Sequence, residues 1–300
     1  MNVAIFYDEK KKDAAMAIKN IIISHECDVT LYNEDEIWKD ENLHTPRHIM
    51  KNITHVLFIY SKNPAAYLGF MFFSGYATGL NLPVLVLEES EKLELPKNFL
   101  RSFVMLTIKS FESYFEVEKK RFTENQLKEL ARAKLLENGY SLFIPNYVRA
   151  VKNNEKEIVE LFIDAGFDPS QKDSLGTPVL SLAVRNKCLE TLELLLEKGA
   201  AINLCAEDRN YSALMDAAQV GYIEAVQALL EKKADTNIQS KDGQTALILS
   251  VGRREADIVE MLVKHGADYN IKDGLGMSAL GYAKLFGDKK ILSLFGEQTN

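Results

Sequence analysis

The sequence contains little cysteine, and its thiols show no pairing pattern. Three cysteines, Cys27, Cys188 and Cys205, occur in 300 residues, without any Cys-x-x-Cys spacing or cluster of cysteine with histidine. An odd number of unpaired cysteines is typical of a reducing compartment and argues against a disulfide-linked scaffold. We therefore expect neither a disulfide nor a metal site.

Positive charge is also in short supply. Lysine and arginine number 36 against 43 aspartate and glutamate residues, which gives a net charge of -7. Such a chain offers phosphate backbones no broad cationic surface, so nucleic acid is not an expected partner. The common nucleotide signatures, Gly-x-Gly-x-x-Gly and the P-loop, are missing as well, and we predict no cofactor.

No segment has the pattern of a signal peptide or of an uninterrupted membrane span. Met1–Lys12 passes from a short apolar run into charged residues, which is not the basic-then-apolar order of a leader. Residues 63–87 carry no charge, and a bilayer span needs about 20 apolar residues, but glycines and prolines interrupt this stretch. We expect a buried helix and a buried strand there, no contact with a membrane, and a cytoplasmic location.

Strand-like and helix-like patterns alternate over residues 1–109. The predicted strands are 3–7, 28–32, 55–60, 83–87 and 103–108, and the predicted helices are 13–24, 46–52 and 65–78. Such alternation predicts a parallel sheet covered by helices. Five strands with short connections suit a flavodoxin-like sheet of order 2-1-3-4-5, in which a ligand binds beyond the carboxyl ends of the strands. The predicted ligand pocket comprises Tyr7, Asp8, Tyr60, Ser61 and Glu88.

One segment of this domain shows a family resemblance. The run Phe73-Ser-Gly-Tyr-Ala-Thr-Gly-Leu-Asn-Leu-Pro-Val84 resembles the nucleoside 2-deoxyribosyltransferase and TIR-domain group, in which a Glu-x-Gly-Tyr-Ala helix leads into a Lys-Pro-Val strand. The group cleaves an N-glycosidic bond with an essential glutamate, and Phe73 occupies that position here. The resemblance therefore implies that catalysis is lost unless another carboxylate, such as Asp8 or Glu88, substitutes.

Residues 110–139 separate this domain from the second half of the chain. The segment is rich in charge, and its apolar residues recur at helical spacing, as at Phe122, Leu127, Leu130 and Leu136. We predict a helical connector between an α/β domain at 1–109 and an all-α domain at 140–300.

The second half repeats itself with a period of about 33 residues. One marker closes four similar helices at Gly166, Gly199, Lys233 and Gly266, and a second marker begins at Thr177, Ser212, Thr245 and Ser278. Each of these Ser or Thr residues precedes an apolar helix, so we predict that its hydroxyl caps the helix N-terminus. One helix pair cannot cover its own apolar face, so neighbouring units must stack.

These markers resemble the ankyrin repeat family, whose repeats carry a Thr-Pro-Leu-His turn, an Ala-Ala inner helix, a leucine-rich outer helix and a Gly-Ala-Asp loop. The resemblance implies a solenoid of about five units, at 141–172, 173–206, 207–239, 240–272 and 273–300. Two departures stand out. The histidine of the family turn is missing, and an extra residue between Arg185 and Leu189 predicts a bulged turn.

In the ankyrin family, partners are usually bound by loops called fingers and by the inner helices, which together form a concave face. Carried onto this sequence, the finger residues are Asp208, Arg209, Tyr211, Asp242, Gln244, Asp273 and Leu275. The inner-helix residues are Asp216, Gln219, Leu249, Arg253 and Tyr282. We expect Leu249 and Tyr282 to form an exposed apolar patch, because solvent alone favours polar side chains at such positions.

Two classes of function follow from these patterns. The first is a non-catalytic adaptor, in which the repeats bind a protein partner and the α/β domain senses a ligand or forms a homodimer. The alternative is an enzyme that acts on the N-glycosidic bond of a nucleoside or nucleotide, with the repeats recruiting a substrate or regulator. The phenylalanine at position 73 favours the adaptor.

Overall fold

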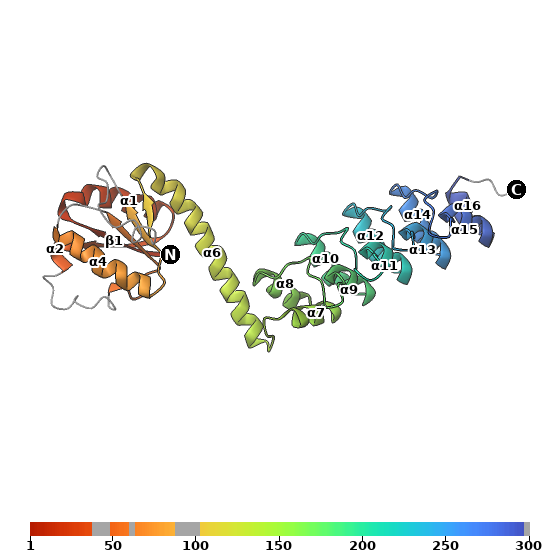
Figure 1. The fold of residues 1–300 in the computed structure, drawn as a ribbon, viewed down its shortest axis with the longest axis horizontal. Coiled ribbons are helices and arrows are strands. Elements are labelled where there is room, and N and C mark those ends of the chain that lie inside the picture. The colour runs from red at the N-terminus through yellow and green to blue at the C-terminus, as the bar shows by residue number, and fades with distance from the viewer. Residues whose placement is uncertain (38–48, 60–63, 88–102, 297–300) are drawn as a thin grey trace. The chain divides into compact units, whose positions relative to one another are not determined.

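The computed structural model describes residues 1–37, 49–59, 64–87 and 103–296 (Figure 1). The chain divides into two compact units, Met1–Asn125 and Gln126–Asn300, which are called the sheet unit and the repeat unit below. Helix α6 (Ile108–Glu137) occupies most of the segment predicted as the connector, and the division falls within this helix.

The sheet unit is built on five parallel strands. They are β1 (Asn2–Tyr7), β2 (Asp28–Asn33), β3 (His55–Ile59), β4 (Val84–Leu87) and β5 (Val104–Leu106). Their order is β2-β1-β3-β4-β5, and every neighbouring pair is parallel. The predicted five-stranded parallel sheet and its strand order are thus confirmed.

Helices cover both faces of this sheet (Figure 1). They are a short 3-10 helix η1 (Glu9–Lys11), α1 (Lys12–Ser24), α2 (Glu34–Ile37), α4 (Pro64–Gly79) and the first part of α6. One hydrophobic cluster joins Ile5 of β1 to Ile18 of α1, and the other joins Phe6 of β1 to Phe73 of α4. Because both faces are covered, β1, β3 and β4 are apolar at nearly every position.

Two predicted elements differ from the observed ones. Residues 46–48 of the helix expected at 46–52 lie outside the described residues; Ile49 is helical, and Met50–Asn52 forms a turn, so the helix ends earlier than expected. The last strand is shorter than expected because Thr107 and Ser110 exchange hydrogen bonds that begin α6, with the Thr107 amide 3.0 Å from the Ser110 hydroxyl. Every helix in the described ranges is too short or too polar to cross a membrane.

Five helix pairs make up most of the repeat unit. The inner helices are α7 (Ile144–Lys152), α9 (Val179–Arg185), α11 (Ala213–Val220), α13 (Ala246–Arg253) and α15 (Ala279–Phe286). The outer helices are α8 (Lys156–Asp164), α10 (Leu189–Glu197), α12 (Ile223–Glu231), α14 (Ala256–Lys264) and α16 (Lys289–Leu294). Each helix packs on its counterpart in the next pair, and one hydrophobic core runs through the whole stack (Figure 1).

The predicted helix caps are confirmed in three of the four repeats. The side chains of Ser212, Thr245 and Ser278 each accept a hydrogen bond from the backbone amide three residues later. The prediction for Thr177 is wrong, because Pro178 occupies the N-cap position of α9 and has no side-chain oxygen to offer.

The bulged turn predicted between Arg185 and Leu189 is also wrong. A left-handed residue follows each inner helix, and it lies at the same distance from the N-cap in the second to fifth repeats. These residues are Lys187, Gly221, Arg254 and Gly287. The extra residue lies instead in the loop before α11, where Ala206 to Tyr211 replaces the shorter Asp173 to Thr177.

Candidate functional site

Each inner helix from α9 onward is preceded by a finger loop. The four loops are residues 173–178, 206–212, 240–245 and 273–278, and each turns at a residue with positive φ: Gly176, Asn210, Gly243 and Gly276. In three loops the side chain of the first residue stabilises the turn by accepting hydrogen bonds from two backbone amides. Asp273 Oδ1, for example, lies 2.9 Å from the amide of Leu275 and 3.0 Å from that of Met277.

Backbone hydrogen bonds also join each finger to the next. The Glu207 amide donates to the Gly176 carbonyl at 3.1 Å, the Lys241 amide to Arg209 at 3.0 Å, and the Gly274 amide to Asp242 at 2.8 Å. The approach is so close that a Cβ at Gly243 would lie 2.9 Å from the Gly274 nitrogen. The fingers therefore form one continuous ladder.

The predicted finger residues divide into exposed and buried ones. Asp208, Arg209, Asp242 and Leu275 are exposed, and Leu275 keeps 84% of its surface. The backbone amide of Arg209, 2.7 Å from the Asp208 carboxylate, lowers the pKa of Asp208. These four side chains are accessible from solvent.

Tyr211, Gln244 and Asp273 lie beneath the finger surface. The Tyr211 hydroxyl donates to Gln244 Oε1 at 3.2 Å, and the Arg209 guanidinium lies 4.3 Å from the centre of the tyrosine ring. Burial raises the pKa of Tyr211. Asp273 is buried as well, and its second oxygen accepts a hydrogen bond from the Tyr282 hydroxyl at 2.7 Å. These groups hold the fingers in position.

The inner-helix residues are less accessible than expected. We predicted an exposed apolar patch at Leu249 and Tyr282. The prediction is wrong for Leu249, which is only 7% exposed. Its helix, α13, is packed between α11 and α15, and Leu249 belongs to the shared hydrophobic core. Tyr282 and Gln219 are half-buried, and Arg253 is exposed.

Asp216 is buried, and its partner is a residue that the sequence did not single out. The Asp216 side chain is 3% exposed, and its Oδ1 lies 3.0 Å from Nε of Arg185. Burial raises the pKa of Asp216, while the arginine opposes that shift. In the sequence, Arg185 could have been noticed only as a positively charged residue at the end of the apolar run that forms α9.

Only part of the predicted ligand pocket of the sheet unit lies within the described residues. Tyr60, Ser61 and Glu88 fall outside them. Tyr7 and Asp8 are buried at the end of β1, and Asp8 Oδ1 accepts a hydrogen bond from the Lys11 amide at 3.1 Å, which caps η1. Phe73 is 2% exposed, and its ring centroid lies 4.8 Å from that of Phe6. The position that carries glutamate in the resembled group is therefore part of the hydrophobic core.

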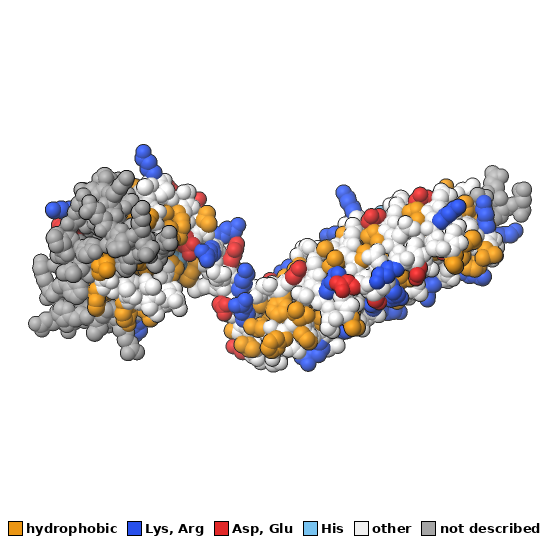
Figure 2. Space-filling view, viewed as in Figure 1, with side chains coloured by type: hydrophobic (Ala, Val, Ile, Leu, Met, Phe, Trp, Pro, Cys, Tyr) orange, Lys and Arg blue, Asp and Glu red, His pale blue; other side chains and the backbone are white. Residues whose placement is uncertain are grey.

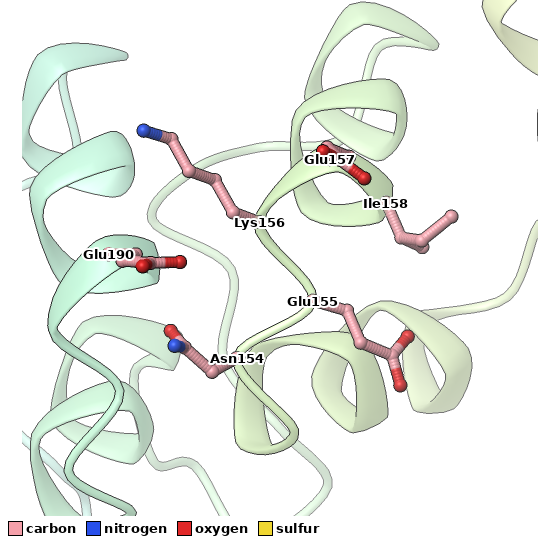
Figure 3. A pocket seen from close by; sticks show the side chains of 6 residues that line it. All are labelled: Asn154, Glu155, Lys156, Glu157, Ile158 and Glu190. Carbon is pink, nitrogen blue, oxygen red and sulfur yellow. The ribbon is translucent and has the colours of Figure 1, made fainter.

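A depression of about 340 Å³ lies in the repeat unit, where α8 and α10 begin. Its lining residues are Asn154, Glu155, Lys156, Glu157, Ile158 and Glu190. Asn154, Lys156 and Glu190 face the gap between the two helices, whereas Glu155 and Ile158 point away from it (Figure 3). Carboxylates are stabilised near helix N-termini, and Asn154 accepts a hydrogen bond from the Thr191 amide. The depression is thus explained as a junction between repeats.

Known proteins have sequences similar to this chain. A family model described as ankyrin repeats (3 copies) matches residues 148–240 and 214–299. An ankyrin repeat-containing protein of Treponema pallidum is 39% identical over 297 residues, which cover 99% of this chain and 100% of that protein. The B-cell lymphoma 3 protein homolog of Mus musculus is 33% identical over 135 residues, 44% of this chain and 30% of that protein. Ankyrin repeat and SOCS box protein 6 of Homo sapiens is 33% identical over 113 residues, 37% of this chain and 26% of that protein.

Helix pairs that stack through one shared core, each preceded by a finger loop, define a solenoid repeat protein. The chain belongs to the ankyrin repeat family. The similarity to the treponemal protein spans the sheet unit as well as the repeats.

Proposed function

We propose that the protein is a non-catalytic adaptor that binds a partner protein along the fingers and inner helices of its repeats. The observation that carries this proposal is the backbone ladder between the fingers, which holds exposed side chains of mixed chemistry in fixed places. A surface that is ordered before binding loses little conformational entropy when a partner docks. The ankyrin repeats of the family are protein-binding modules, which is the role proposed here.

The proposal assigns different roles to the two layers of the surface. The exposed residues Asp208, Arg209, Asp242, Leu275 and Arg253 contact the partner, together with the half-buried Gln219. A second layer positions them from below, and it consists of Tyr211, Gln244, Asp216, Leu249, Asp273 and Tyr282. Substitutions in the first layer should weaken binding without loss of stability, whereas those in the second should affect both.

Site-specific crosslinking tests this proposal. A photoreactive residue placed at Asp242, on a finger, should capture a protein from a lysate of the source cells. The matched control is Glu231, which is exposed at the end of the outer helix α12. The proposal predicts a discrete adduct at Asp242, weakened by Arg209→Glu, and little capture at Glu231. Equal capture at both positions, or none at Asp242, would contradict it.

For the sheet unit, we propose a non-catalytic role in the cytoplasm, either in sensing a ligand or in self-association. Support comes from Phe73, which packs into the core where the resembled group has its glutamate. The full chain incubated with NAD and deoxynucleosides should release no free base above a heat-denatured control. Base release would contradict the non-catalytic role, and sedimentation at several concentrations would measure self-association.

A further inference from the structure

The residue just before the left-handed turn of each finger forms a row of four tip residues: Leu175, Arg209, Asp242 and Leu275. The two outer members are leucines with exposed fractions of 77% and 84%, larger than those of the other exposed large hydrophobic side chains in the described residues. The two inner members are charged and exposed. The row is therefore apolar at both ends and charged in the middle.

A single exposed leucine needs no explanation in a soluble protein. These two differ because they occupy the same position of the first and fourth fingers, and turns at this position ordinarily carry polar residues or glycine. Side chains that expose more than three-quarters of their surface contribute little to folding. The ladder from Gly176 to Gly274 also fixes both leucines on one continuous edge.

The geometry of the row restricts what can bind to it. The amides of all four tip residues donate hydrogen bonds within their own loops, and the Arg209 and Asp242 carbonyls accept bonds from the neighbouring finger, so the tips offer a partner mainly their side chains. Adjacent helices pack about 8–10 Å apart, and three such steps separate Leu175 from Leu275 by roughly 24–30 Å. A helix rises about 1.5 Å per residue, so about 16–20 residues span this distance.

The charges between the leucines give the row a direction. The Arg209 side chain is half-exposed, and its Nε is 3.5 Å from the Asp208 carboxylate, which leaves the guanidinium open to a further acidic group. The Asp242 carboxylate forms no ion pair with any residue that the structure describes, and its charge is open to a basic group. A partner helix that matches both charges can bind in one orientation only.

We propose that the four tips bind one amphipathic helix of a partner protein, with an apolar side chain against each leucine. An acidic residue of that helix faces Arg209, and a basic residue faces Asp242. This inference rests on the proposed protein-binding function and narrows the partner to a helical segment of about 16–20 residues. Figure 2 shows that hydrophobic and charged side chains both reach the surface of the repeats, as such a mixed interface requires.

The test selects binders from a displayed library of 20-residue peptides with a helix-forming background, using the full-length chain as bait. Enriched peptides should carry apolar residues near both ends, with acidic and basic residues between them. Leu175→Asp and Leu275→Asp should each weaken their binding at least about tenfold, which is the effect of losing an interface anchor. The matched control is Leu127→Asp, because Leu127 is a 59% exposed leucine on α6, and it should change affinity less than about twofold.

The outcomes separate this inference from the broader function. Thermal melting should be unchanged in all three variants, since each side chain is exposed, so weaker binding cannot be attributed to unfolding. Peptides that depend on Arg209 yet tolerate both leucine substitutions would overturn the helix inference and leave the adaptor role intact. Failure to enrich any peptide would overturn the inference, and absence of finger crosslinks in addition would overturn the adaptor role.

Discussion

The two units of the chain bury their apolar side chains in different ways. In the sheet unit, β1 pairs with both β2 and β3, and separate clusters of side chains cover the two faces of the sheet. In the repeat unit, each inner helix packs mainly on its neighbours, as α11 does on α9 and α13. Damage to a central strand should therefore spread through the sheet unit, whereas damage to one repeat should concentrate on adjacent repeats.

Each unit also contains a buried titratable side chain whose pKa is shifted by burial. In the sheet unit, His55 is 1% exposed and its Nε2 lies 3.3 Å from Glu118 Oε1. In the repeat unit, the buried member of the pair is an acid, Asp216, next to the partly exposed Arg185. A buried base and a buried acid respond to pH in opposite directions, so the two units can be distinguished by acidification.

The largest effect is expected from Phe73→Glu. This change restores the carboxylate of the resembled group, but it places a charge in the core beside Phe6. Burying a carboxylate without a partner costs several kcal/mol, against a typical domain stability of about 5–15 kcal/mol. We expect the sheet unit to unfold, so that its amides exchange rapidly with solvent. The helices of the repeats should keep their slow amide exchange. Phe73→Leu is the control and should keep the sheet folded; a folded Phe73→Glu sheet would contradict the core assignment.

A smaller effect is expected from Leu229→Ala in α12, a side chain that is completely buried. The resulting cavity should lower the free energy of unfolding of the repeat unit by about 2–5 kcal/mol. Hydrogen exchange should accelerate most in α12 and in the neighbouring outer helices α10 and α14. Uniform acceleration across both units would contradict the local character of the repeat core.

The effect of acidification should be smaller, because one group contributes at most about 1.4 kcal/mol for each pH unit within its window. Burial lowers the pKa of His55 below 6.5, although Glu118 opposes this shift. The unfolded chain then binds the proton more readily, so the sheet unit loses stability as pH falls through 6.5 towards the folded pKa. Burial raises the pKa of Asp216 above 3.8, so the repeat unit loses stability as pH rises from 3.8 through the folded pKa.

Two variants isolate these opposite responses. Hydrogen exchange between pH 7 and pH 3.8, corrected for the intrinsic exchange rate at each pH, should show a smaller acid-induced loss in the sheet unit of His55→Gln than in that of the wild type. Asp216→Asn should show a smaller acid-induced gain in the repeat unit. A variant with the same pH dependence as the wild type would show that its group does not cause the response.

The smallest effect concerns a helix cap. The Ser212 hydroxyl accepts a hydrogen bond from the Met215 amide at 3.3 Å at the start of α11. Ser212→Ala should lower the melting temperature of the repeat unit, at a cost of about 1 kcal/mol. Ser174→Ala, at an exposed position of the preceding finger, serves as the control and should leave the melting temperature unchanged.

The sequence predicted the architecture of both units well because local patterns determine it. Continuous apolar runs separated by helical segments indicated a covered parallel sheet, and the 33-residue period indicated stacked helix pairs. The caps at Ser212, Thr245 and Ser278 could be read from residue type alone. At Pro178 the same reasoning failed, because Thr177 lies one residue before the N-cap, which follows the left-handed residue of the finger by two positions in all four loops.

The surface was predicted less well than the architecture. Leu249 looked exposed in the sequence, but its burial depends on how closely α11 and α15 approach α13. Asp216 looked available to a partner, yet it is covered and paired with Arg185 from the preceding repeat. Leu175 went unnoticed, although it occupies the same position as Leu275. Such properties depend on contacts between repeats, which periodicity within one repeat does not specify.

The hydrogen bonds between fingers restrict how this protein can change in length. Each loop after the first donates a backbone amide to the loop before it. A unit added in the middle of the array must therefore accept a bond from the next loop and donate one to the previous loop. Duplication or deletion of a whole unit preserves this pairing, whereas partial insertions break it on both sides. Growth of the array by complete units is therefore the tolerated route, and engineered versions of the protein should be lengthened in the same way.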